Sequence, residues 1–213
     1  SPTGVGFTAS NYSITYNNAA LTVDRALLTA PSMTVASRAY DGSLVVVPTV
    51  GSLSGLVGSE TLGVTATGLL DNANVGIRTA TVTYTLANGT NGGLASNYRL
   101  NGVTQSVLIS QRPITVATSV TDRPYDGTTN IATALGSVSN LVGPETLTIT
   151  SASVSDSANA GARTATVTYS LADGTNGGLA SNYSITSLAL PVTIQQRVSV
   201  SYTHLTLPTI LLV

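Results

Sequence analysis

The clearest pattern along the chain is an alternation of threonine with apolar residues. Between Thr79 and Leu86, every second residue is threonine, and the residues between them are alanine, valine, tyrosine and leucine. Successive side chains of a β-strand point to opposite faces, so this pattern predicts a strand with one buried and one solvated face. Thr164–Leu171 has the same pattern with one serine and predicts a second such strand.

Other apolar segments extend this β pattern along the chain. We expect further strands at Ile114–Val120, Leu147–Val154 and Tyr183–Ile194. Clusters of Gly, Asn and Asp, which favour turns, lie at 71–76, 156–161 and 173–178. No segment has a 3.6-residue apolar period, although 93–97 could form one short helical turn. The sequence therefore predicts an all-β module of five to seven strands.

The chain is an internal repeat with an offset of 85 residues, the distance from Tyr40 to Tyr125. The segment RTATVTY begins at Arg78 and again at Arg163, and GTNGGLASNY begins at Gly89 and again at Gly174. A third Ala-Ser-Asn-Tyr occurs at 9–12. We therefore divide the chain into the end of a preceding copy (1–24), a first copy (25–111) and a second copy (112–197).

Gln111-Arg112-Pro113 joins the two copies. So short a connection favours a semi-rigid string of modules over loosely tethered ones. For the architecture we expect Ig-like β-sandwiches arranged end to end. A β-grasp-like module is the alternative.

Charge and composition exclude several functional classes. Charged residues make up 8% of the chain, the net charge is −1, and the basic residues are scattered arginines, so no nucleic-acid partner is expected. Hydrophobic residues make up 42%, enough for a folded core. The absence of cysteine rules out disulfides and thiolate metal sites. No apolar run reaches the roughly 18 residues of a membrane helix, so no membrane insertion is expected.

The most conspicuous candidate motif is Tyr-Asp-Gly, which occurs with an arginine two residues before it at Tyr40, Asp41 and Gly42 and again at Tyr125, Asp126 and Gly127. Aspartate accepts hydrogen bonds from nearby backbone amides and glycine supplies a positive φ, so the motif favours a structural turn with the tyrosine packed beneath it. Calcium binding is the alternative. One carboxylate supplies too few of the six to eight oxygens that calcium takes.

Other candidate chemistry is weaker. Glu145 with Asp156 could form a glycosidase-like pair, but nothing in the sequence fixes their separation, and Glu145 is expected at the exposed start of a strand. Gly92-Gly93 and Gly177-Gly178 lack the helix and lysine of a phosphate loop, so loop flexibility explains them. The pairs Asn97-Tyr98 and Asn182-Tyr183 are interpreted as a turn followed by a core tyrosine. We expect no catalytic residue, metal site or cofactor.

The C-terminal segment 198–213 does not continue the repeat. Arg197 should open another copy, yet no Tyr-Asp-Gly follows, and the peptide from Val200 to Thr209 resembles a translated sequencing adapter. We therefore give no functional weight to His204, which is the only histidine.

Taken together, these motifs resemble the YDG repeat domains of bacterial filamentous-haemagglutinin-like surface proteins. The likeness covers nearly all of 1–197. It implies a secreted adhesin at the bacterial cell surface, associated with the outer membrane, in which the repeats form a stalk or passenger shaft. The family has no catalytic residues to carry over.

Two functions of different classes follow from this resemblance. In the first, the chain is a non-enzymatic structural stalk whose partners are neighbouring repeats. In the second, it is a binding module for a carbohydrate or protein of the host or cell surface, using the loops at 71–78 and 156–163 or at 88–97 and 173–182. Clustered exposed aromatic residues in those loops would favour binding, whereas polar loops in both copies would favour the stalk.

Overall fold

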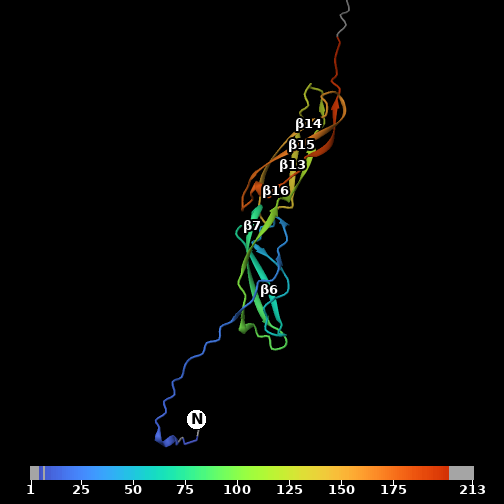
Figure 1. The fold of residues 1–213 in the computed structure, drawn as a ribbon. Coiled ribbons are helices and arrows are strands. Elements are labelled where there is room, and N and C mark those ends of the chain that lie inside the picture. Colours follow the sequence, from blue (N-terminus) through green and yellow to red (C-terminus); the bar gives the residue numbers. More distant parts are fainter. Residues whose placement is uncertain (1–4, 7, 202–213) are drawn as a thin grey trace, which may run out of the picture. The chain divides into compact units, whose positions relative to one another are not determined.

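The computed structural model describes residues 5, 6 and 8–201 (Figure 1). Within them, β-strands and short 3-10 helices form all of the regular structure, so the all-β class is confirmed. The 3-10 helices are Ala9–Asn11, Ala95–Asn97 and Ala180–Asn182, and each lies on a copy of the Ala-Ser-Asn motif. None of the helices in this part of the chain is long and apolar enough to cross a membrane.

The first copy contains nine strands. Their bounds are β1 Ala26–Leu27, β2 Met33–Thr34, β3 Arg38–Ala39, β4 Val45–Val46, β5 Thr49–Val50, β6 Leu62–Leu70, β7 Gly76–Asn88, β8 Tyr98–Arg99 and β9 Val103–Ser110.

The second copy contains eight strands. Their bounds are β10 Arg112–Pro113, β11 Thr115–Val120, β12 Arg123–Pro124, β13 Thr133–Ser139, β14 Leu147–Ser155, β15 Gly161–Asp173, β16 Tyr183–Ser184 and β17 Leu188–Gln195. The expected five to seven strands per module are therefore too few, because several strands are two-residue pairings too short to leave a periodic pattern.

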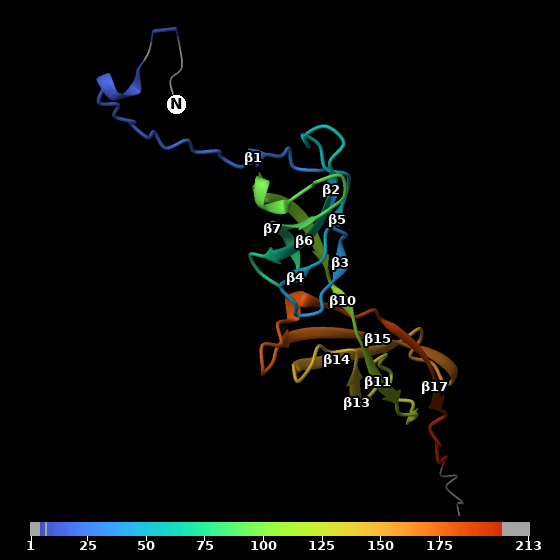
Figure 2. The ribbon, with the colours of Figure 1, turned by 90° about the horizontal axis from the view of Figure 1, so that it is seen from below.

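The main sheet of the second copy has the order β12-β17-β15-β14. β14 and β15 form a long antiparallel hairpin whose register runs from Leu147 opposite Asp173 to Ser155 opposite Ala165 (Figure 2). β17 is antiparallel to β15, whereas β12 is parallel to β17. β11 pairs with β13 in a separate two-stranded sheet.

The first copy repeats this topology in the sheet β3-β9-β7-β6-β4. β3 is again parallel to the last strand, β9, and β7 is antiparallel to β9. β1 pairs in parallel with β8, as β10 does with β16. The equivalent strands of the two copies therefore hold equivalent positions in their sheets.

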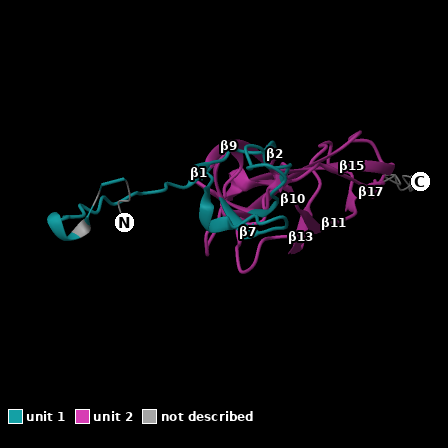
Figure 3. Ribbon diagram, turned by 60° about the horizontal axis from the view of Figure 1, so that its bottom comes forward, with its two compact units in different colours: residues 1–32, 50–65, 84–102 teal, residues 33–49, 66–83, 103–213 magenta. Residues whose placement is uncertain are grey.

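Contacts within the chain divide it into two compact units (Figure 3). Unit 1 comprises residues 1–32, 50–65 and 84–102, and unit 2 comprises residues 33–49, 66–83 and 103–213. Unit 2 thus holds the whole second copy together with the part of the first copy that contains the turn at Tyr40.

The threonine alternation corresponds to the long strands β7 and β15. On β7, Ala80 and Val82 are fully buried while Thr79, Thr81 and Thr83 are exposed. On β15, Ala165 is fully buried and packs in a cluster with Ile131 and Val192. Apolar side chains on one face and threonines on the other are what period-two patterning predicts.

The single strand expected at Tyr183–Ile194 is wrong. The chain forms β16 at Tyr183–Ser184, leaves the sheet at 185–187 and begins β17 at Leu188. β16 pairs with β10, whereas β17 pairs with β15 and β12. Two different partners interrupt a segment whose composition alone favours one strand.

Candidate functional site

The most elaborate side-chain cluster lies in unit 2, where the turn at Tyr40 meets the second copy. Tyr40 is only 4% exposed. Its hydroxyl donates a 2.6 Å hydrogen bond to Oε1 of Glu145. Its ring meets the ring of Tyr183 edge to face, with centroids 5.5 Å apart and an interplanar angle of 83°. This is a favourable aromatic geometry, so the second copy binds the tyrosine through both its ring and its hydroxyl.

The acceptor for Tyr40 is a preassembled pair of side chains in the second copy, Glu145 and Tyr183, which we call the Glu–Tyr pair. The Tyr183 hydroxyl donates to Oε2 of Glu145 at 2.6 Å and accepts from the Val142 amide at 3.0 Å. The Glu145 carboxylate therefore accepts one phenol from each copy. Hydrogen bonds to a charged acceptor are stronger than those between neutral groups.

Arg112, at the start of the second copy, stabilises the contact between the turn at Tyr40 and the second copy, which we call the junction. Its Nε donates to the Asn140 carbonyl at 2.7 Å, and its Nη2 donates to Oδ1 of Asn140 at 2.6 Å. Its Nη1 lies 3.4 Å from the Tyr40 carbonyl. Asn140 also donates to the Pro113 carbonyl at 2.6 Å. Arg112, the middle residue of the connection between the copies, is thus fixed to both sides of the junction.

A second contact between the copies involves Asn182, which is fully buried. Its Oδ1 accepts from the Val75 amide at 3.0 Å, and its Nδ2 donates to Oδ1 of Asn74 at 3.0 Å. Arg78 holds this loop in place by donating to the carbonyls of Asn74 and Val75, each at 2.7 Å. A buried amide with its donor and acceptor satisfied fixes the loop against the second copy.

Each Tyr-Asp-Gly turn is closed by its own arginine and aspartate. In the first, Arg38 donates to Asp41 at 2.8 Å, and Oδ1 of Asp41 accepts from the Ser43 amide at 2.9 Å. Gly42 has φ of +74°, and a Cβ on it would lie 3.0 Å from Cγ1 of Val142. Glycine at this position therefore serves both the turn and the approach of the second copy.

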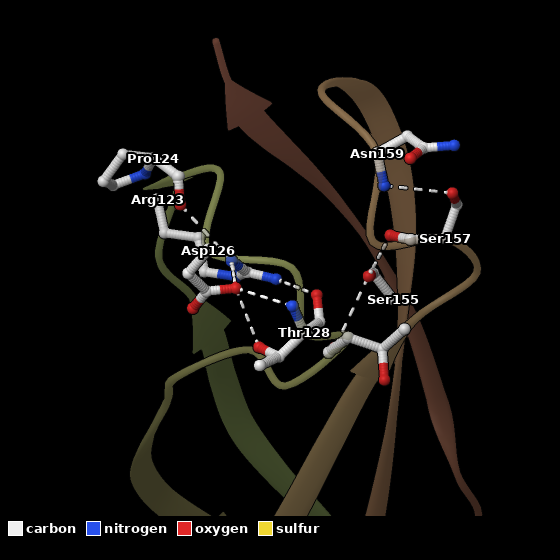
Figure 4. Close-up of polar contacts among 8 residues, drawn as sticks. Arg123, Pro124, Asp126, Thr128, Ser155, Ser157 and Asn159 are labelled. Atoms are coloured by element: carbon white, nitrogen blue, oxygen red, sulfur yellow. Dashed lines mark hydrogen bonds and ion pairs between the residues drawn. The ribbon is translucent and has the colours of Figure 1, made fainter. Parts of the chain in front are cut away.

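The second turn has the same internal bonds (Figure 4). The Arg123 guanidinium and the Thr128 amide converge on the Asp126 carboxylate, with the amide bond 2.8 Å long. The Thr128 hydroxyl adds a bond of 2.9 Å. The Thr128 backbone bond leads the interactions that lower the pKa of Asp126, and Arg123 contributes to the same effect.

The comparisons with known proteins identify the module. A family model of the YDG domain matches residues 24–106 and again residues 110–190, which together cover most of the chain. The chain belongs to the YDG domain family. No match was found among curated proteins, and none among solved structures.

The equivalent Tyr-Asp-Gly tyrosines of the two YDG domains differ in burial. Tyr40 is buried at the junction, but Tyr125 is 40% exposed, so the expectation that a tyrosine packs beneath each turn is wrong for Tyr125. The reason is that the side chains burying Tyr40 come from the next YDG domain and not from its own turn. Asn97 and Asn182 differ in the same way, since Asn97 is exposed.

Burial changes the titration of the junction tyrosines. Desolvation, followed by the hydrogen bond to the Glu145 carboxylate, raises the pKa of Tyr40 well above its usual range. The same two causes raise the pKa of Tyr183. Both phenols therefore stay protonated, as donors to the carboxylate must.

The structure separates the proposed carboxylate pair. Glu145 precedes and Asp156 follows β14, which is nine residues long. At about 3.3 Å per residue this strand alone is roughly 30 Å long, so the two residues lie at its opposite ends, whereas the carboxyl groups of glycosidase pairs lie about 5 to 10 Å apart. Glu145 is half-buried at the junction and not exposed at a strand start, which corrects our expectation for it.

The second glycine of each glycine pair is explained by close packing. A Cβ on Gly93 would overlap the Thr61 carbonyl, and one on Gly178 would overlap the Thr146 carbonyl. Close approach of the backbone, not loop flexibility, therefore requires these two glycines. Among the described residues, no group of three or more His, Cys, Asp or Glu side chains could hold a metal ion.

Sequence reasoning missed the partners of the Tyr-Asp-Gly tyrosine. Arg112 was placed in the connection between the copies, but Glu145, Asn140 and Asn74 were not recognised as junction residues. The recurrence of Leu-Val-Gly-x-Glu-Thr-Leu at 56–62 and 141–147 was the available signal, because a glutamate present in both copies of a repeated motif indicates a repeated partner. His204 and most of the segment 198–213 lie outside the described residues.

Proposed function

We propose that the chain is a structural stalk or passenger segment of a secreted bacterial surface adhesin, and that it acts without catalysis or a cofactor. Tandem YDG domains and the side-chain junction between them support this role. The proposed partners are neighbouring repeats of the same chain. The proposed location is the extracellular or outer-membrane-associated surface of the bacterium.

The observation that carries the proposal is the burial of Tyr40 against Glu145 and Tyr183. A stalk must hold consecutive modules in a fixed relation, and only Gln111 separates β9 from β10. Directional hydrogen bonds to a charged group at such a connection restrict rotation between modules, whereas a flexible linker would leave it free.

The exposed faces also suit a stalk. Threonines line the solvated sides of β7 and β15, and threonine combines high β propensity with a hydroxyl that hydrogen-bonds water. A surface of this kind stays solvated over many repeats without a strong charge of either sign.

The alternative role, a carbohydrate- or protein-binding module, lacks the residues that would favour it. The loops at 71–78, 156–163, 88–97 and 173–182 contain no aromatic residue. Aromatic side chains supply much of the contact energy at recognition surfaces. The loops therefore favour the stalk.

For the module itself, we keep the Ig-like β-sandwich as our proposal and the β-grasp-like module as the alternative. Sandwiches of the Ig type are built from antiparallel sheets. The parallel pairs β3–β9 and β12–β17 are the observation that favours the alternative.

Surface exposure in the producing bacterium tests the proposed function. An antibody raised against residues 25–197 should label intact cells, and brief protease treatment should remove the label while a cytoplasmic control protein stays intact. Labelling that appears only after permeabilisation would contradict a surface role. Purified chain should also fail to bind glycans or host cells, and specific binding would favour the alternative.

A further inference from the structure

Unit 1 contains a cavity of about 390 Å³ beside Tyr98. Its lining includes Asp24, Arg25, Val57, Glu60, Asn97 and Tyr98. Its volume falls within the range of about 300 to 1,000 Å³ typical of ligand sites. It lies at the position in the first copy that corresponds, 85 residues earlier, to the site holding Tyr40.

The polar side of this cavity repeats the Glu–Tyr pair. The Tyr98 hydroxyl donates to Oε2 of Glu60 at 2.5 Å and accepts from the Val57 amide at 3.0 Å. Tyr183, Glu145 and Val142 form the same bonds in the second copy. The pair therefore assembles in both copies, whether or not a tyrosine occupies the site, and such preorganisation favours binding.

Three of the groups equivalent to those that contact the first copy at the junction are accessible at this cavity, whereas the Tyr98 side chain itself is only 3% exposed. Within the described residues, Oε1 of Glu60 accepts no hydrogen bond, whereas Oε1 of Glu145 accepts one from Tyr40. Val57 is 64% exposed, while the equivalent Val142 is half-buried facing Gly42. Asn97 is exposed, as noted above. The first copy thus presents the Glu60 carboxylate, Val57 and Asn97 in the arrangement that binds Tyr40 in the second copy.

The second copy presents the complementary surface. Tyr125 projects from a turn with the same internal bonds as the turn at Tyr40. Ala160 corresponds to Val75, whose backbone amide donates to Asn182. Because this contact uses the backbone, Ala160 can donate an equivalent hydrogen bond despite its different side chain. Asn159, the equivalent of Asn74, is exposed.

We propose that the cavity beside Glu60 and Tyr98 binds the Tyr-Asp-Gly turn of a second copy of this chain, so that chains associate head to tail. The Tyr125 hydroxyl of one chain donates to Oε1 of Glu60 in the next. The Ala160 amide donates to Oδ1 of Asn97. The inference extends the proposed function, because it uses the same junction between modules.

The contact between chains is weaker than the junction within one chain. Ala26 pairs with Tyr98 as Arg112 pairs with Tyr183, so the bracing arginine is absent, and Gly55 stands where the second copy has Asn140. Two separate chains also lack the high effective concentration that a direct connection provides. Each head-to-tail contact leaves one cavity and one turn free, so association continues beyond a dimer.

Sedimentation equilibrium of the full 213-residue chain tests this proposal. The mean mass should rise with concentration from the micromolar to the millimolar range and exceed that of a dimer. Tyr125→Ala removes the turn's side chain, and Val57→Arg blocks the cavity. Each variant alone should associate at least about tenfold more weakly than the wild type. An equimolar mixture should form a dimer and nothing larger, because each variant keeps the surface that the other lacks.

Val47→Arg is the matched control, since Val47 is 81% exposed and lies outside both surfaces. It should associate like the wild type. Tyr125→Phe and Glu60→Gln test the same contact with minimal change of shape, and circular dichroism checks that each variant is folded. A wild type that stays monomeric throughout, or variants that associate like the wild type, would overturn the proposal. Neither result depends on where the protein is located in the cell.

Discussion

Two tyrosines in nearly the same local sequence have different surroundings in this chain. Tyr40 and Tyr125 each follow an arginine by two residues and precede Asp-Gly, and both turns have the same internal bonds. Among the described residues, a Glu–Tyr pair from a following module contacts Tyr40 and none contacts Tyr125. Burial of the residue is therefore decided by its position in the array and not by its own motif.

Replacing Tyr40 by phenylalanine should destabilise the chain, because it keeps the ring and leaves Oε1 of the half-buried Glu145 without its donor. A lost hydrogen bond to a charged group costs about 1.5 to 3 kcal/mol. Tyr125→Phe is the matched control and should change the free energy of unfolding by less than about 0.5 kcal/mol. Urea denaturation followed by circular dichroism measures both. Equal effects of the two substitutions would contradict the role assigned to Tyr40.

The junction should weaken in alkaline solution. Burial and Glu145 raise the pKa of Tyr40, so its stabilising contribution is complete below the ordinary tyrosine pKa of about 10. This contribution to the free energy of unfolding is lost as the pH rises from about 10 towards the raised pKa of Tyr40 in the folded chain, because over this range the unfolded chain releases the tyrosine proton more readily than the folded chain does. Tyr40→Phe should reduce this loss of unfolding free energy. An unchanged pH dependence in that variant would contradict the assignment.

At the scale of elements, the loops before the 3-10 helices Ala95–Asn97 and Ala180–Asn182 each depend on a glycine with no space for a side chain. Gly178→Ala forces a Cβ against the Thr146 carbonyl and should cost more than about 2 kcal/mol. Gly93→Ala should act in the same way at the Thr61 carbonyl. In thermal unfolding, both midpoints should fall clearly.

Gly143→Ala is the control for this prediction. Gly143 has φ of +52° and open space around its Cβ position, so alanine there has only the backbone cost of about 1 to 2 kcal/mol. If Gly178→Ala destabilised less than Gly143→Ala, close packing would not be the reason for the glycine.

Long strands were predictable from the sequence because their signal is local. The threonine alternation predicts the core of β7 and of β15, and Leu147–Val154 predicts all but the last residue of β14. Two-residue strands such as β10 and β16 have no such signal, since each depends on a partner far along the chain. The break between β16 and β17 was missed for the same reason.

The junction could not be derived from local patterns. Tyr40 and Glu145 are 105 residues apart, and Val75 and Asn182 are 107 residues apart. The repeat shows which residues recur, but it does not show that the tyrosine of one copy meets the glutamate of the next. Only the packing of consecutive copies supplies that pairing.

On the scale of the whole molecule, side-chain contacts should couple consecutive YDG domains in motion. In the wild type, 15N relaxation should give residues 33–49 and the second copy one common rotational correlation time. Combining Tyr40→Ala with Asn182→Ala removes both contacts and should separate the correlation times. Tyr125→Ala, which leaves the junction intact, should keep them equal. Independent tumbling in the wild type would contradict a stalk.

The central claim is that the Tyr-Asp-Gly tyrosine of one YDG domain is bound by the Glu–Tyr pair of the next. Nuclear Overhauser effects between tyrosine rings, measured at a concentration where the chain is monomeric, test it most directly. With ring centroids 5.5 Å apart, Tyr40 and Tyr183 should show cross-peaks between their ring protons, and Tyr125 should show none to Tyr98. Absence of the cross-peaks between Tyr40 and Tyr183 in the folded chain would contradict the claim.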